Sequence, residues 1–365
     1  MPQGVRLLVA AALFFVAASA LTAFAVWRDL VDYMGDPGPT EGEVAVLIPP
    51  GEGMAQIAGR LRDAGVIERP WMFRLGARLL GQDRSLKAGE YAFPAAVSPR
   101  GVLAMLHRGD TVVRRVTVTE GATVAEVFAM LAEAPGLTGD LPEPPPEGSL
   151  LPETYFYALG ETREAVVERM RRAMERAVEE LWTRRPEGLP LASPGELVTL
   201  ASIVEKETAV AAERSQVAAV FLNRLRRGMR LQSDPTVIYH LTGGDGRLGR
   251  PLRRSDLAEN GPYNTYQVDG LPPGPIANPG RDALAAVIDP ADVDYLYFVA
   301  DGTGGHVFAR TLDEHNRNVA RWRRIQRGEV LPPVRPPPPP KPEATPAADG
   351  SAPEPTDAAE PAVAN

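Results

Sequence analysis

Two glutamates on one helical segment, Glu205 and Glu207, are the side chains whose type and position could carry out acid–base chemistry. The segment begins at Ser193-Pro194-Gly195-Glu196, and a serine before a proline with a glutamate three residues later is typical of a helix N-terminus. Apolar residues then recur at helical spacing, at Leu197, Leu200, Ala201 and Val204. Glu207 falls beside this apolar face, whereas Glu205 projects roughly 200° away from Glu207. The two carboxyls are therefore not expected to line one cleft, and Lys206 is expected on the solvated face.

The position of Glu207 has two interpretations. A carboxyl at the edge of an apolar surface is desolvated, which raises its pKa and keeps it protonated near neutral pH, as an acid that protonates a glycosidic oxygen requires. The other interpretation is an ordinary structural glutamate that is paired with an arginine. Helical periodicity alone favours the structural one, so a catalytic role for Glu207 needs support from other parts of the chain.

Three polar loops further along the chain, two of them stiffened by prolines, give that support. They occupy residues 230–236, 261–266 and 270–280. Aromatic rings can pack against the apolar side of sugars, while hydroxyl, amide and carboxyl groups bind sugar hydroxyl and acetamido groups. The candidate saccharide-binding residues are Gln232, Ser233, Asp234, Thr236, Tyr239, Tyr263, Asn264, Thr265, Tyr266 and Asn278. The alternative is that the tyrosines of the second loop are half-buried anchors and that the asparagine of the third only starts the next helix.

The composition argues against several other functions. A formal net charge of −8 and a pI near 5.3 argue against a protein that binds nucleic acid. Cysteine is absent and the four histidines are scattered, so we expect no disulfide, no metal site and no cofactor. The motifs GxSxG, SxxK and GxxxxGK[ST] do not occur. A GxGxxG match at 244–249 is followed at once by Pro251 instead of a helix, so we expect a hairpin turn there.

The amino terminus predicts a membrane anchor. Residues 7–27 form an uncharged apolar run of the length that spans a bilayer. Arg6 before it and Trp27 at its end favour a cytoplasmic tail at residues 1–6 and the remainder of the chain outside. Small residues at 18–20 and 23–25 also allow a cleaved signal peptide, but the apolar run is longer than the usual signal core. Residues 28–43 are expected to be a tether.

The remainder of the chain divides into two predicted domains. Residues 44–135 combine strand-like and helical segments in a weak internal repeat, which predicts a small α/β domain. A proline-rich joint at 136–149 separates it from a second domain at 150–328, which begins with an amphipathic helix and ends with a β-hairpin and a capped helix. The tail at 329–365 is rich in proline and alanine and is expected to be disordered.

At several of these segments the chain resembles the endolytic murein transglycosylase (MltG or YceG-like) family. The resemblance covers nearly all of residues 1–328 and is carried by these phrases: Leu150-Leu-Pro-Glu-Thr-Tyr155, Ala201-Ser-Ile-Val-Glu-Lys-Glu-Thr208, Asn223-Arg-Leu225, Leu231-Gln-Ser-Asp-Pro-Thr-Val-Ile-Tyr239, Tyr263-Asn-Thr-Tyr266, Gly270-Leu-Pro-Pro-Gly274 and Tyr297-Phe-Val-Ala-Asp301. It implies an α+β protein with a membrane anchor, a small LysM-like domain that faces the cell wall, and a lysozyme-like catalytic domain with β-hairpin elaborations.

The resemblance also implies a mechanism. Glu207, with Glu205 in reserve, would protonate the oxygen between N-acetylmuramic acid and N-acetylglucosamine in nascent peptidoglycan. It would then accept the proton of the muramyl C6 hydroxyl as a 1,6-anhydro ring closes and elongation ends. The implied location is the periplasmic side of the bacterial inner membrane, beside penicillin-binding protein synthases. A hydrolytic muramidase and a non-catalytic peptidoglycan-binding scaffold remain the alternatives.

Overall fold

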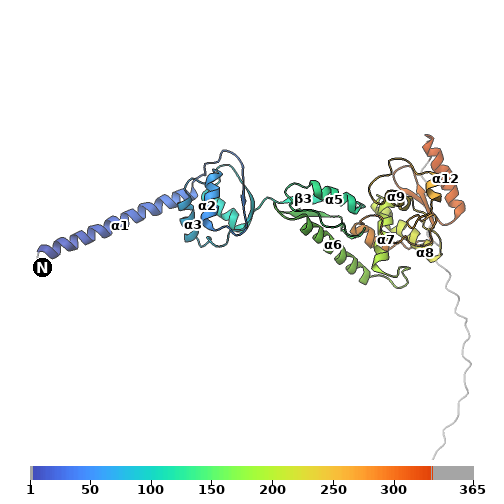
Figure 1. The fold of residues 1–365 in the computed structure, drawn as a ribbon, viewed down its shortest axis with the longest axis horizontal. Helices are drawn as coiled ribbons and strands as arrows, with labels where there is room; N and C mark the ends of the chain where they lie inside the picture. Colours follow the sequence, from blue (N-terminus) through green and yellow to red (C-terminus); the bar gives the residue numbers. More distant parts are fainter. Residues whose placement is uncertain (1–2, 330, 332–365) are drawn as a thin grey trace, which may run out of the picture.

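The structure is a computed structural model that describes residues 3–329 and 331. Figure 1 shows an elongated molecule, in which a long N-terminal helix leads into a small domain and a single stretch of chain joins that domain to a larger part. Helices alternate with small antiparallel sheets, as the predicted mixed class requires. Most of the predicted tail at 329–365 lies outside the described residues, as does the start of the predicted cytoplasmic tail.

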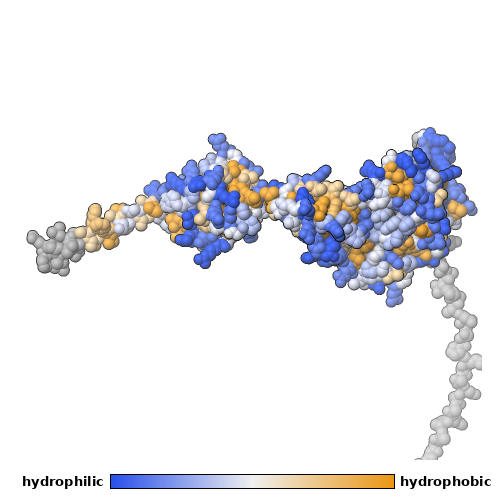
Figure 2. Space-filling model, in the orientation of Figure 1, coloured by the Kyte–Doolittle hydropathy of each residue, from blue (hydrophilic) through white to orange (hydrophobic). Residues whose placement is uncertain are grey.

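Helix α1 (Gln3–Gly35) contains the apolar run predicted to cross a membrane. Its part from Ala11 to Gly35 is long and apolar enough for one span, and Figure 2 shows apolar side chains exposed along it. The prediction of a tether at 28–43 was wrong in its first part, because the helix continues through it to Gly35. Leu30 and Met34 are buried against the first domain, and this packing stabilises the additional turns.

The first domain packs two antiparallel strands against three helices. Its elements are β1 (Val44–Ile48), α2 (Met54–Asp63), α3 (Pro70–Leu79), β2 (Gly89–Phe93) and α4 (Pro99–Arg108). Val46 of β1 lies opposite Tyr91 of β2, and alternate residues of both strands enter the core. The strands and helices predicted between residues 44 and 107 are therefore present, in the order strand, helix, helix, strand, helix.

The predicted domain at 44–135 is not one unit, because its last part belongs to a second core. That core is built from β3 (Arg114–Thr117), α5 (Val124–Glu133), β4 (Thr154–Tyr157) and the first half of α6 (Arg163–Thr183). Strand β3 pairs with β4 with Val116 opposite Tyr155, and the apolar face of α5 packs on α6. The division falls between α4 and β3, and the predicted joint at 136–149 lies inside the second unit. The repeat in the sequence does not reveal this, because the strand and helix that complete the second core come after the joint.

A third core surrounds α7 (Pro194–Glu207) and positions the candidate site. The other elements here are the 3₁₀ turn η1 (Ala211–Glu213), α8 (Arg214–Arg226), α9 (Asp234–Thr242), α10 (Arg254–Ala258), α11 (Arg281–Ile288), β5 (Tyr297–Ala300), β6 (His306–Ala309) and α12 (Leu312–Gln326). Helix α7 contacts α6, α8, α9 and α11, and every residue from Leu197 to Val204 is buried. The helix is thus enclosed on all sides, whereas the sequence pattern indicated a single apolar face.

Local sequence signals explain how the elements of this third core begin and end. Ser193 accepts a hydrogen bond from the backbone N–H of Glu196, which confirms the predicted start of α7. Thr311 and Glu314 form the predicted capping box of α12, and β5 and β6 form the predicted hairpin. The predicted hairpin turn at 244–249 was wrong, because this segment is an irregular loop with no flanking strands.

Candidate active site

Glu207 is the last residue of α7, and its carboxyl is held by one hydroxyl. Ser233 Oγ donates a hydrogen bond of 2.5 Å to Glu207 Oε1. The pKa of Glu207 is raised to about 7, mainly by burial and also by the charge of Asp234, while the Ser233 hydrogen bond opposes the rise. The end of a helix is also its negative pole, which disfavours a carboxylate. The side chain keeps partial access to solvent, so a carboxyl with a pKa near 7 can exchange protons with a ligand.

The loop that carries Ser233 is fixed by the second polar loop. The Ser233 N–H donates to Thr265 Oγ1 at 2.9 Å, and Thr236 Oγ1 lies 2.8 Å from the same hydroxyl oxygen. The Gln232 N–H donates to the Thr265 carbonyl at 3.1 Å, and Gln232 has a φ of 49°, a backbone conformation that non-glycine residues rarely adopt. Thr236 and Thr265 are fully buried, so they position Ser233, while Gln232 is exposed.

Two predicted asparagines are fully buried and hold backbone segments together. Asn264 donates to the carbonyls of Asp256, Leu257 and Glu259, and its Oδ1 accepts from the Tyr266 N–H. Asn278 accepts from the Leu150 N–H at 2.9 Å and donates to the Ala122 carbonyl at 2.9 Å. The structure therefore places both side chains inside the protein, where they order the loops around Glu207.

The three predicted tyrosines lie in two places. The rings of Tyr239 and Tyr263 contact each other at a centroid distance of 4.9 Å with a tilt of 52°, and both residues are half-buried. Tyr266 donates its hydroxyl to Asp234 Oδ1 at 2.7 Å, and the negative charge of Glu207 is one cause of the raised pKa of Tyr266. Asp234 and Tyr266 are thus close to Glu207, whereas Gln232 is exposed and precedes Ser233 in the chain.

Comparison with known proteins decides the family. The model of the YceG-like family matches residues 46–321, which is most of the chain. This protein belongs to the YceG-like family. The chain is 31% identical over 306 residues to the endolytic murein transglycosylase of Bacillus subtilis (strain 168), covering 75% of this chain and 83% of the relative. It is 32% identical over 326 residues to that of Streptococcus pneumoniae (strain D39), covering 76% of this chain and 58% of the relative. A solved yceG-like protein from Listeria monocytogenes aligns with 30% identity over 76% of this chain and 99% of that one, with a TM-score of 0.48.

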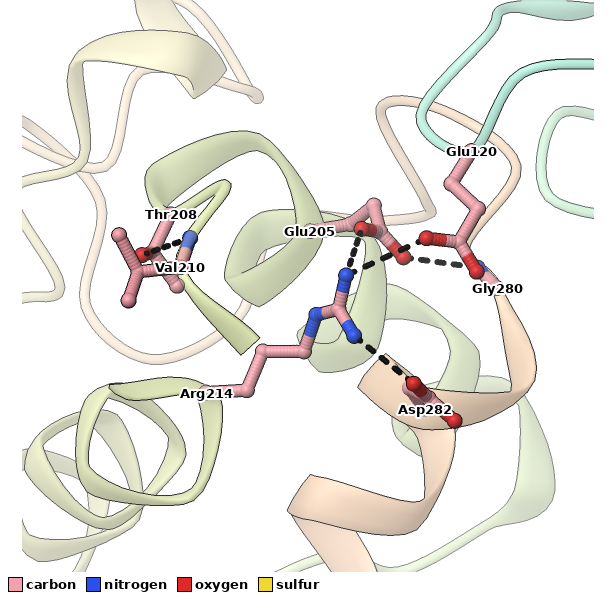
Figure 3. Close-up of polar contacts among 7 residues, drawn as sticks. All are labelled: Glu120, Glu205, Thr208, Val210, Arg214, Gly280 and Asp282. Carbon is pink, nitrogen blue, oxygen red and sulfur yellow. Dashed lines mark hydrogen bonds and ion pairs between the residues drawn. The ribbon is translucent and has the colours of Figure 1, made fainter. Parts of the chain in front are cut away.

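Glu205, the reserve candidate in this YceG-like chain, is engaged elsewhere. Its side chain is only 5% exposed, its Oε2 accepts from the Gly280 N–H at 2.8 Å, and its Oε1 lies 3.4 Å from Arg214. Figure 3 shows the Arg214 guanidinium between three carboxylates, the others being Glu120 at 3.2 Å and Asp282 at 3.1 Å. The same figure shows Thr208 accepting from the Val210 N–H, which turns the chain after α7. The predicted separation of the two glutamates is confirmed, and the arginine partner expected of a structural glutamate belongs to Glu205.

Two groups near Glu207 were not predicted from the sequence. Glu213 binds His306 twice, through Oε1 to the backbone N–H at 2.9 Å and through Oε2 to Nδ1 at 2.8 Å. Arg224 donates to the carbonyls of Leu296 and Leu231 at 2.7 and 2.6 Å. His306 and Arg224 both act to lower the pKa of Glu207 against the effect of burial. Arg224 lies in the phrase Asn223-Arg-Leu225 that carried the resemblance, whereas nothing in the sequence linked Glu213 to His306.

Proposed function

We propose that this chain is an endolytic lytic transglycosylase that cleaves the β-1,4 bond between N-acetylmuramic acid and N-acetylglucosamine in nascent peptidoglycan. The observation that carries the proposal is the Glu207 carboxyl, with a pKa of about 7 and one oxygen held by Ser233. The relatives named endolytic murein transglycosylase support the substrate class and the reaction.

In the proposed reaction, one proton leaves Glu207 and one returns to it. Protonated Glu207 gives its proton to the bridging oxygen as the bond from that oxygen to the muramyl C1 breaks. The muramyl C6 hydroxyl then bonds to C1 and releases its proton to the Glu207 carboxylate, which restores the acid and closes a 1,6-anhydro ring. No water is consumed, and no second carboxylate is needed, because the substrate supplies the nucleophile. A pKa near neutral pH suits both transfers.

The hydrogen bonds around Glu207 support this role. Because Ser233 occupies Oε1, we assign the proton transfers to Oε2. Ser233 is buried and fixed by Thr265, so the carboxyl is held in one orientation. Pre-orientation of an acid towards the bond that breaks is a main source of enzymatic rate enhancement.

A hydrolytic muramidase is the second candidate, and Asp234 is the observation that favours it. Asp234 is exposed and accepts a hydrogen bond from the Tyr266 hydroxyl. It is close enough to Glu207 to raise the pKa of Glu207. A second carboxylate beside a protonated acid is the arrangement in which many glycosidases activate water or form a covalent intermediate. Such an enzyme would release a reducing end in place of an anhydro end.

The deciding experiment is digestion of uncrosslinked glycan strands by the full-length chain in detergent, with mass spectrometry of the fragments. The proposal predicts fragments that are one water lighter than hydrolysis products, and no cleavage by Glu207→Gln. The matched control is Glu196→Gln on the same helix, where the amide oxygen can still accept the Ala192 N–H. Fragments with a reducing end would establish a hydrolytic muramidase. If wild-type protein leaves the glycan intact, a non-catalytic peptidoglycan-binding scaffold is the remaining function.

We further propose that the enzyme is anchored in the bacterial inner membrane with its domains in the periplasm. The apolar α1 supports the anchor, and its continuation into the first domain holds that domain next to the membrane. The order strand, helix, helix, strand with paired outer strands supports a LysM-like, wall-facing role for the first domain. Penicillin-binding protein synthases are the proposed partners, because they produce the strands that such an enzyme would cut.

A further inference from the structure

A groove of about 810 Å³ lies between the second core and the third core. One wall is the segment that leads into α5 together with Ala129 and Met130 of that helix. The opposite wall is α9 and the glycine-rich loop at 243–250. A volume of this size falls in the range of ligand sites, which is about 300–1,000 Å³. The groove exists because these two cores, which share helix α6, face each other.

The groove adjoins the candidate active site. Lys206, which lines it, directly precedes Glu207 in the chain. Pro235 lines it as well and lies two residues after Ser233, the hydrogen-bond partner of Glu207. From Pro235 the wall follows α9 to its end at Thr242. A polymer whose scissile bond lies at Glu207 could therefore continue along α9 without leaving the protein surface.

The charges along the groove leave one cation without a partner. The carboxylates in the wall are engaged, since Glu120 pairs with Arg214 and Glu126 caps α5. Arg250 pairs with Asp256, and Lys206 Nζ donates a hydrogen bond to the Gly121 carbonyl at 3.1 Å. Arg247 is exposed, and no carboxylate in the described part of the chain pairs with it.

The backbone of the loop that carries Arg247 requires glycine. Gly244 and Gly246 have φ values of 86° and 121°, and a Cβ on Gly244 would lie 3.0 Å from the Tyr239 ring. The loop can therefore pack directly on α9, which brings Arg247 to the edge of the groove. Apolar side chains, including Ile238 and Ile276, line the same groove.

We infer that this groove binds the peptide-bearing part of the strand next to the scissile bond, and that Arg247 pairs with a carboxylate of the stem peptide. This inference rests on the proposed function. The sugars of a peptidoglycan strand are uncharged when the muramyl lactyl group is joined to a peptide, so the negative charges of the strand lie on its peptides. An unpaired arginine in the groove therefore points to the peptide, because guanidinium groups bind carboxylates in a bidentate manner.

The first test blocks the groove. Ala129→Trp places a large ring in it from an exposed position of α5, and Ala125→Trp places the same ring on an exposed position of the same helix that does not line the groove. We expect Ala129→Trp to lower kcat/KM on peptide-bearing strands at least about tenfold, and Ala125→Trp to match wild type. Equal rates for the two variants would overturn the inference, and equal thermal unfolding would show that both are folded.

The second test concerns the charge of Arg247. Peptide-bearing strands and amidase-treated strands are cleaved in parallel, and the ratio of the two kcat/KM values is measured. The amidase leaves a lactyl carboxylate on each muramyl residue, so the ratio separates recognition of the peptide from recognition of a carboxylate on the sugar. We expect Arg247→Ala to lower this ratio roughly three- to tenfold and Arg247→Glu to lower it further. Arg323→Ala, on the exposed face of α12, is the control.

The outcomes separate this inference from the proposed function. If wild-type protein cleaves neither substrate, the proposed function fails. If wild-type protein cleaves both and Arg247→Glu leaves the ratio unchanged, the function stands and the assignment of the groove to the peptide-bearing strand is overturned.

Discussion

The hydroxyl of Ser233 lies 2.5 Å from Oε1 of Glu207, although Glu207 ends α7 and Ser233 lies just before α9, 26 positions further along the chain. Ser233 donates this hydrogen bond while its own N–H donates to Thr265. The contact favours the ionised carboxylate and so opposes the effect of burial on the pKa of Glu207. The protonation state of the proposed acid thus depends on a residue of another loop.

Replacement of Ser233 by alanine should change the pH profile of the enzyme. Without the Ser233 hydroxyl, the carboxylate of Glu207 loses a hydrogen bond that stabilises its ionised form, so the pKa of Glu207 should rise above about 7. The pH optimum should shift upwards, and kcat should fall at least about tenfold because the carboxyl loses its orientation. The measurement is kcat as a function of pH. An optimum that stays where wild type has it would show that the hydrogen bond does not set the pKa.

Replacement of Glu207 by glutamine should abolish cleavage and stabilise the fold at neutral pH. Loss of an acid–base group lowers rates by about 10²–10⁴-fold. The folded protein holds the pKa of Glu207 near 7, above the ordinary value of 4.5, so wild type loses stability as the pH rises from about 4.5 to 7. Glutamine does not titrate, so the variant does not lose stability in this way. The free energy of unfolding of the variant should therefore exceed that of wild type by an amount that grows over the same pH range to at most about 3 kcal/mol. Denaturant unfolding of both proteins at pH 4.5 and 7.5 measures this difference. A difference that shrinks as the pH rises would contradict the raised pKa of Glu207.

Arg214 should be important for stability because it neutralises the buried Glu205. Arg214→Met leaves that carboxyl without its cation, and breaking a buried pair on one side costs roughly 3 kcal/mol. Glu205→Gln in the same chain removes the unpaired charge while an amide oxygen can still accept the Gly280 N–H. The double variant should therefore be more stable than Arg214→Met alone when both are unfolded in urea. A double variant that is less stable would show that Arg214 acts mainly through Glu120 and Asp282.

Asn278 tests whether a predicted binding residue has a structural role. Its amide joins the Leu150 N–H to the Ala122 carbonyl, so Asn278→Ala leaves the buried Leu150 N–H without a partner. The Ala122 carbonyl keeps the hydrogen bond from the backbone N–H of residue 278. The unpaired N–H should lower the free energy of unfolding by about 1–3 kcal/mol. The KM of the folded fraction should remain close to wild type. A raised KM with unchanged stability would instead support direct contact with the saccharide.

The amino terminus of the mature protein should be intact. Helix α1 runs without a break into the first domain, where Leu30 and Met34 are buried. Cleavage after residue 20 or 25 would remove most of the apolar part of the helix and leave its end packed on the domain. Intact-mass measurement of protein extracted from membranes should therefore include residues 1–27. A mass that lacks them would establish the signal peptide.

The sequence by itself predicted most of the helices and strands, the caps of α7 and α12, the apolar amino-terminal segment and the different environments of Glu205 and Glu207. Each of these depends on residues a few positions apart, where hydrogen-bond geometry and helical phase act directly. The predicted start of α7 at Ser193 and the hairpin of β5 and β6 followed from such local signals.

Only the tertiary structure decided which segments share a core and which charges meet. Strand β3 finds its partner in β4, beyond the proline-rich joint, and so the predicted domain boundary was wrong. Glu213 meets His306 across 93 residues, and Arg214 meets Glu120 across 94. Such contacts arise when apolar faces are buried against each other, and a single sequence shows that a face is apolar without showing what covers it. The pKa of Glu207 depends on this burial, so its value was fixed by the packing around α7.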